Sequence, residues 1–236
     1  MKFLYLLQIM VIFLVSCATV PPAIDESFLI EKTPEQIATL EKIENSIIQK
    51  NKEVDAEYKN LDLSKKEVIK EKSMLAVIEK ELSLANEKLK MATALTDENA
   101  IANAQKEEQS VQNKIVKQEI KLRYTQAKET MDECKKNEKV AELNVYVANL
   151  NYEKAKIAKA YQTKKLAENG KPKETKSEKS FLDKFTKDDN GIINENDYLD
   201  FVKSQEDKLE NCRKDLANSI TYFDNEKSIY EASINQ

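Results

Sequence analysis

The sequence has 236 residues, of which 34% are charged, and its formal net charge is −4. Two glycines, four prolines and no tryptophan are typical of long helices or coiled coils and disfavour a sheet protein with many turns. Charges of both signs are interspersed, which argues against nucleic-acid binding. With no histidine and no glycine-rich phosphate loop, histidine-based catalytic triads, histidine metal sites and nucleotide-binding loops are excluded.

The chain begins with a short apolar segment that indicates an export signal. Lys2 precedes an apolar run over residues 3–15 that only Gln8 interrupts. This run is shorter than the roughly 20 residues of a membrane span, but it suits the core of a signal peptide. It ends in the motif LVSC at residues 14–17, which resembles the lipobox of bacterial lipoproteins.

The lipobox resemblance implies that residues 1–16 are a signal peptide, removed just before Cys17. It also implies a diacylglycerol thioether and an N-acyl chain on Cys17, and two chains are enough for stable attachment to a membrane. Ala18 is not the Asp that retains such proteins in the inner membrane, which favours the outer membrane of a bacterial cell envelope, on its periplasmic face or at the cell surface. Residues 17–33 read as the lipidated tether. An ordinary signal peptide with a chance cysteine is the alternative.

Residues 34–168 are predicted to form long coiled-coil helices. Thr33 is a cap signal before Pro34 at the first helical position. A strict sevenfold apolar repeat follows, which implies a left-handed supercoil against a partner helix. Its members are Leu40, Ile47, Val54, Leu61, Val68, Leu75, Leu82 and Leu89. A less regular companion position is assigned to Ile37, Ile43, Tyr58, Ile78 and Ala85.

A second cap signal near residue 95 predicts either a tight hairpin turn or a kink, followed by a second helix to about residue 168. This helix carries a row of small residues, which lets neighbouring helices approach closely and predicts packing against more than one of them. The row consists of Ile120, Ala127, Cys134, Ala141, Ala148 and Ala155.

A polar linker is predicted over residues 169–180, and residues 203–236 are expected to form a C-terminal helix packed on the bundle. Sevenfold spacing recurs in the last helix, which is predicted from near 194 to about 232, at Val202, Leu209, Leu216, Phe223 and Tyr230. The predicted fold is therefore all-α, an elongated antiparallel helical bundle or coiled coil. A rod whose helices pair between chains is the alternative and would make the protein a homo-oligomer.

Two cysteines remain besides Cys17. Cys134 lies on the row of small residues of the second helix. Cys212 lies in the last helix, three residues after Leu209, at the next position of that helix's own apolar face. Export from the cytoplasm permits disulfides. A Cys134–Cys212 bridge within the chain is predicted, with two buried thiols or an interchain bridge as the alternatives.

The segment FLDKFTKDDNGIINENDYLDFV, residues 181–202, resembles an EF-hand, the helix–loop–helix that wraps Ca²⁺ in oxygen ligands. Gly191 falls at the sixth place of the twelve-residue loop, where the turn is sharp, and the flanking apolar residues fall where the family's two helices meet. By this resemblance the ligands are Thr186, Asp188, Asn190, Ile192, Asn194 and Asp197.

Two residues depart from the EF-hand pattern. The first place is normally Asp but holds Thr186, and the twelfth is normally Glu but holds the shorter Asp197. Fewer charges and a shorter ligand predict weak Ca²⁺ binding, or a shift towards Mg²⁺. The alternative is that Asp-Asn-Gly makes a simple turn and Asn194 caps the next helix.

The sequence predicts a lipid-anchored scaffold or interaction protein of the cell envelope without catalytic activity. It would bind the membrane through its lipid and other proteins by helix packing, with no nucleic acid. A Ca²⁺-responsive binding module that acts through the EF-hand-like segment is the alternative. An efflux-type adaptor is disfavoured, because adaptors also need glycine-rich β domains. An enzyme is disfavoured as well, because charge runs on helices are usually solvated faces.

Overall fold

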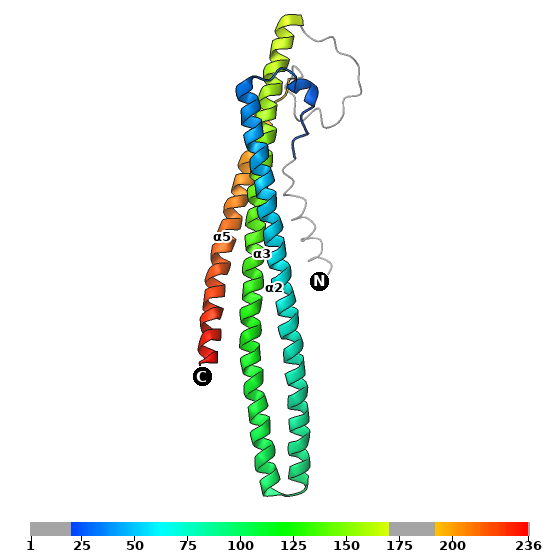
Figure 1. Ribbon diagram of the computed structural model, residues 1–236, viewed down its shortest axis with the longest axis vertical. Helices are drawn as coiled ribbons and strands as arrows, with labels where there is room; N and C mark the ends of the chain where they lie inside the picture. The colour runs from blue at the N-terminus through cyan, green and yellow to red at the C-terminus, as the bar shows by residue number, and fades with distance from the viewer. Residues whose placement is uncertain (1–19, 170–191, 236) are drawn as a thin grey trace, which may run out of the picture. The chain divides into compact units, whose positions relative to one another are not determined.

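The computed structural model describes residues 20–169 and 192–235. The predicted signal peptide, Cys17 and the first part of the predicted EF-hand-like segment, with Thr186, Asp188 and Asn190, lie outside these residues. The described chain is almost entirely helical, and its three long helices pack against each other, so the all-α prediction is confirmed. Its elements are η1 (Glu26–Leu29), α2 (Pro34–Ala94), α3 (Glu98–Asn169) and α5 (Glu195–Ile234) (Figure 1).

The start of α2 is a reciprocal capping box. The Thr33 hydroxyl oxygen accepts a hydrogen bond from the backbone N–H of Gln36 at 3.2 Å, and the Gln36 side-chain oxygen accepts one from the backbone N–H of Thr33 at 2.9 Å. Each residue thereby satisfies a donor that the first helical turn leaves free. The predicted helix start after Thr33 is confirmed.

The connection between α2 and α3 is a tight turn, which decides between the two predicted possibilities. Thr96 has φ 55°, a left-handed conformation that is uncommon for a β-branched residue. The Asp97 carboxylate then accepts a hydrogen bond from the backbone N–H of Ala100 at 3.1 Å and caps α3. Thr96 takes a backbone conformation that glycine usually takes in turns. The sequence therefore lacked the glycine that would have distinguished a tight turn from a kink.

The chain divides into two compact units. Each long helix contributes one part to unit 1 and the other part to unit 2. Unit 1 comprises Met1–Lys52 and Val140–Asn211, and unit 2 comprises Glu53–Lys139 and Cys212–Gln236.

Unit 1 has its core where the N-terminal segment meets the helices. Lys50 of α2 pairs with Glu142 of α3 at 2.9 Å. The N-terminal segment, predicted to be a tether, contributes η1 and its buried Leu29 to this core. The core cluster consists of Leu29, Leu40, Ala155, Ile157, Ala158, Ile193 and Tyr198.

In unit 2, α2 and α3 form an antiparallel hairpin. Near the turn Lys88 pairs with Glu107 at 2.6 Å, and farther from it Glu67 pairs with Lys128 at 3.0 Å. The partners move along the two helices in opposite directions, as an antiparallel pair requires.

α5 packs on α3 in unit 2, also antiparallel. Arg213 of α5 lies 3.4 Å from Glu138 of α3, and the ring of Tyr230, farther along α5, stacks on Tyr124 with centroids 4.9 Å apart. α3 therefore has neighbours on two faces, as its small residues predicted, and Ala127, Ala141, Ala148 and Ala155 are all buried.

The companion row of α2 was partly wrong. Ile37 and Tyr58 are exposed, because each lies one residue beyond the face that meets α3. That face belongs instead to a sevenfold row with polar members, and its buried residues are Ser64, Glu71, Ala85 and Ala92. The prediction followed apolar character alone and so missed this row, because two of its buried members are Ser64 and Glu71.

Candidate functional site

The described half of the predicted cation loop is the start of α5. The Asn194 side-chain oxygen accepts a hydrogen bond from the backbone N–H of Asn196 at 3.2 Å, as a helix cap does. Its amide donates to Asp197 Oδ1 at 2.9 Å. Two of the six predicted ligands thus hold each other at the helix start, and Ile192 lies half-buried just before them.

Asp197 keeps one oxygen without a hydrogen-bond partner among the described residues. Its Oδ2 is buried and accepts no hydrogen bond from any described residue. Burial, with the nearby negative charge of Asp200, raises the pKa of the Asp197 carboxyl. A cation would satisfy such an oxygen and reverse this shift, so Asp197 fits the twelfth ligand place. Within residues 20–169 and 192–235, however, no three His, Cys, Asp or Glu side chains come together as a metal site.

The residues beside these ligands lock the start of α5 in place. The backbone N–H of Ile193 donates to the Gln162 side-chain oxygen on α3 at 2.8 Å, and Ile193 makes an isolated β-bridge. Tyr198 is only 2% exposed, and its hydroxyl donates to the backbone oxygen of Pro22 at 2.9 Å. Burial, with the charge of Asp197, raises the pKa of Tyr198 to about 12. The start of α5 is therefore joined directly to α3 and to the N-terminal segment.

Of the apolar flanks predicted for the EF-hand-like segment, Tyr198 and Val202 are buried and Phe201 is half-buried. The flanking residues before the loop, Phe181, Leu182 and Phe185, lie outside the described residues. The second flank thus has the burial that the resemblance implies, while the pairing of the two flanks stays a prediction.

The two cysteines of unit 2 are free thiols, both half-buried. Burial raises the pKa of the Cys212 thiol, and the negative charge of Asp215 and the neighbouring Cys134 and Glu138 raise it further. Cys134 is thus within electrostatic reach of Cys212. The Arg213–Glu138 pair holds α5 and α3 in the register that brings the two thiols near each other. Their disulfide stays a prediction.

Sequence reasoning missed two buried polar clusters between α2 and α3. In one, the Ser64 hydroxyl donates to Asp132, which also lies 3.6 Å from Lys135. In the other, Glu71 is 1% exposed. Its carboxylate accepts a hydrogen bond from the Gln118 amide at 2.7 Å and pairs with Lys121 at 3.1 Å. The available signal was the sevenfold spacing of Ser64 and Glu71 with Ala85 and Ala92.

The Glu71 carboxyl stays ionised in its buried place. Burial has the largest single influence and raises its pKa. The hydrogen bonds from Gln118 and Lys121, with the charges of Lys121 and Lys70, outweigh burial and leave the pKa below its usual value. The charge of Glu71 is therefore part of the helix packing.

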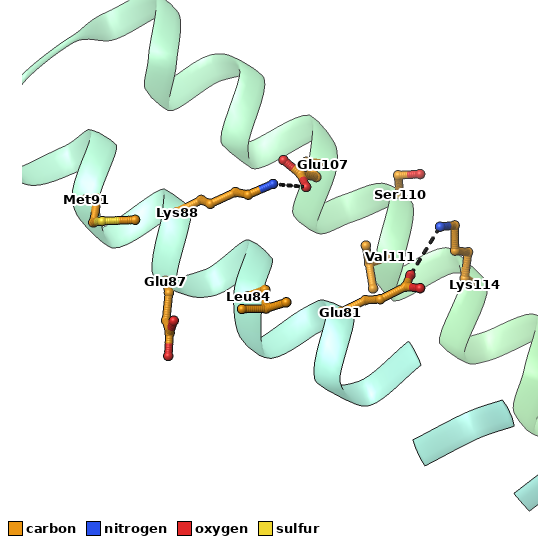
Figure 2. A pocket seen from close by; sticks show the side chains of 9 residues that line it. All are labelled: Glu81, Leu84, Glu87, Lys88, Met91, Glu107, Ser110, Val111 and Lys114. Carbon is orange, nitrogen blue, oxygen red and sulfur yellow. Dashed lines mark hydrogen bonds and ion pairs between the residues drawn. The ribbon is translucent and has the colours of Figure 1, made fainter. Parts of the chain in front are cut away.

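A groove lies between α2 and α3 near their turn, with a volume of about 480 Å³. Figure 2 shows that Leu84 of α2 lies between two ion pairs that cross the groove, Lys88–Glu107 and Glu81–Lys114. The other lining residues are Glu87, Met91, Ser110 and Val111.

Comparison with protein-family models, curated proteins and solved structures found no match for this chain. In the part of the chain that the structure describes, each helix is too short or too polar to cross a membrane.

Proposed function

We propose that this protein is a lipid-anchored helical scaffold of the bacterial cell envelope, without catalytic activity, held at the outer membrane through Cys17. The observation that carries the proposal is the apolar segment of residues 3–15, which ends in the LVSC motif of residues 14–17. The chain after it folds into long helices that expose both charged and large apolar side chains, as suits a protein that binds others by helix packing.

Perturbed side chains in the helices support a structural role. The lowered pKa of Glu71 and the raised pKa values of Lys128 and Lys156 go with ion pairs, to Lys121, Glu67 and Glu153 respectively. Structural ion pairs shift pKa values by themselves, so these shifts need no catalytic role to explain them.

The lipid would hold unit 1 close to the membrane surface. Pro22 is bound by the Tyr198 hydroxyl, and Pro21 is buried. Only five residues separate Cys17 from Pro22, and an extended chain covers at most about 3.6 Å per residue, so the lipidated residue lies within about 18 Å of Pro22. The anchor would therefore hold the start of α5 near the membrane, through the contact between Tyr198 and Pro22.

The anchor is tested by fractionating cells that express the Cys17→Ser chain. We expect wild-type protein in the membrane fraction, released only by detergent, and the variant in the soluble fraction or retained as the longer precursor. Cys134→Ser is the matched control and should behave like wild type. A Cys17→Ser chain that is cut at the same place and still fractionates with membranes would refute the lipid anchor.

A Ca²⁺-responsive module is the second candidate, and Asp197 Oδ2, which is buried and has no hydrogen-bond partner among the described residues, favours it. Cation binding at Asp197 would act through the neighbouring Tyr198 on the Pro22 contact. Calorimetric titration with Ca²⁺ at millimolar concentration should give heat with wild type and none with Asp188→Ala. Asp189→Ala is the control, because that residue points away from the ligand places in the EF-hand alignment. Equal traces for all three proteins would eliminate this function.

A further inference from the structure

Unit 2 exposes a row of large apolar side chains on α2, away from the face that meets α3. Val77, Leu84 and Met91 recur at intervals of seven, so they share one face of the helix, and two further residues flank that face. All members are between 40% and 77% exposed. We call this row the α2 stripe: Met74, Val77, Leu84, Met91 and Leu95. Large contiguous apolar patches are rare on the surface of soluble monomers and mark interaction sites.

Among the described residues of unit 2, no third helix lies beside the hairpin at the stripe. α5 packs on α3 at Arg123 and Tyr124, and it ends at Ile234 (Figure 1). From there to the turn at Thr96, the described residues of unit 2 form two helices. Two paired helices bury only their facing sides, whereas a four-helix arrangement buries a second face of each.

The stripe is symmetric about Leu84. Val77 and Met91 are both seven residues from it, and Met74 and Leu95 are ten and eleven residues away. The two charged residues within the stripe are also placed symmetrically but have opposite signs, with Glu81 three residues before the centre and Lys88 four after it. Reversing the helix therefore puts apolar residues on apolar residues and an acid on a base.

The groove at Leu84 has the geometry that receives a helix. Its α2 wall is Leu84, Glu87, Lys88 and Met91, at the spacings of three, four and seven residues that form the hole for an incoming side chain in a coiled coil. Figure 2 shows these residues on one stretch of α2, opposite the α3 wall. The α3 wall repeats the same spacings with Glu107, Ser110, Val111 and Lys114.

We propose that two copies of this chain associate through the α2 stripe, antiparallel, about a two-fold axis at Leu84. A two-fold interface must be complementary to itself, which is the property that the stripe has. Val77 then faces Met91 of the second copy, and Glu81 faces Lys88 of the second copy. This inference deepens the proposed scaffold function, on which its biological use rests, because it joins two anchored chains.

Sedimentation equilibrium on the full-length chain in detergent, with its three cysteines replaced by serine, tests the association. Such a chain also lacks the lipid, so the result does not depend on the anchor. We expect a reversible dimer, and at least a tenfold weaker dimer in Leu84→Asp. Ile69→Asp is the matched control, because Ile69 is 64% exposed on the same helix but lies off the stripe, and it should dimerise like the parent. A parent chain that stays monomeric at all concentrations would overturn the proposal.

Cross-linking and charge reversal test the axis. In the same cysteine-free chain, Leu84→Cys should form a disulfide-linked dimer on mild oxidation, far faster than Ile69→Cys. Glu81→Lys and Lys88→Glu should each weaken the dimer, and the double reversal should restore it. Because the double reversal breaks both ion pairs to α3, it would be the weakest variant if only those pairs mattered. That result, or equal cross-linking at residues 84 and 69, would refute the two-fold arrangement.

Discussion

Replacing Glu71 by alanine tests whether a buried charge holds α2 and α3 together. The carboxylate accepts a hydrogen bond from Gln118 at 2.7 Å and pairs with Lys121 at 3.1 Å, in a place that is almost closed to water. Glu71→Ala removes both interactions and leaves their partners behind. We expect a lower free energy of unfolding and unchanged helix content in the folded state.

The size of the loss follows from what the partners can do afterwards. Removing one member of a buried ion pair costs about 3–5 kcal/mol when the other is left without water or a partner. Here the Lys121 side chain is 32% exposed and can regain water, and the Gln118 amide keeps its 3.1 Å hydrogen bond to the backbone oxygen of residue 71. We therefore expect about 2–3 kcal/mol, the range for hydrogen bonds to a charged group.

The assay is urea unfolding followed by circular dichroism, with Glu79→Ala as the control, since Glu79 is exposed on the same helix. The pKa of Glu71 is lowered, so its stabilisation is present above pH 4.5 and is lost as the pH falls through the lowered value. Glu71→Gln should accordingly approach wild-type stability in acid. A Glu71→Ala chain as stable as Glu79→Ala at pH 7 would refute the reasoning.

Three further predictions concern the other perturbed side chains. Tyr198→Phe should lower the free energy of unfolding by about 1 kcal/mol, because Pro22 loses its hydrogen bond. Wild type should also lose stability as the pH rises from 10 to about 12, and denaturant titrations should show that Tyr198→Phe lacks this loss. Asp197→Asn should raise the melting temperature at pH 7 in a chelator, because the carboxylate with its raised pKa destabilises the fold above pH 3.8, and the gain should vanish in stronger acid. In the reduced chain, Cys212 should react slowly with iodoacetamide at neutral pH, since its thiol pKa is raised, and non-reducing mass spectrometry of the native protein should show the loss of two hydrogens on bridging to Cys134.

The helices were predictable because their signals are local. The Thr33 cap, the sevenfold rows and the cap near residue 97 predicted α2 and α3 to within a few residues of their observed bounds. The burial of Ser64 and Glu71 was not predictable in this way. It depends on Asp132 and Gln118, whose positions opposite them follow only once the turn has set the register.

The candidate cation site shows a different limit. Asn194 and Asp197 satisfy both the EF-hand pattern and the pattern of a helix cap, because both use short side chains with oxygen atoms. In the structure they bond to each other at the start of α5, as a cap would, while Asp197 Oδ2 has no hydrogen-bond partner among the described residues. The sequence could not separate these uses, since they share the same residues.

The buried polar clusters and the α2 stripe are linked through register. A seam of leucines and alanines alone fits nearly as well after a shift of seven residues, whereas buried polar partners are satisfied in one register only. That register also brings Glu81 and Lys88 opposite Lys114 and Glu107 and so shapes the groove. Replacing both Glu71 and Gln118 by leucine should therefore leave the chain about as stable as wild type, since replacing both partners of a buried hydrogen bond by apolar groups can be nearly neutral and the partly exposed Lys121 can regain water, but should weaken self-association at Leu84. A double variant that dimerises like wild type would show that the turn alone sets the register.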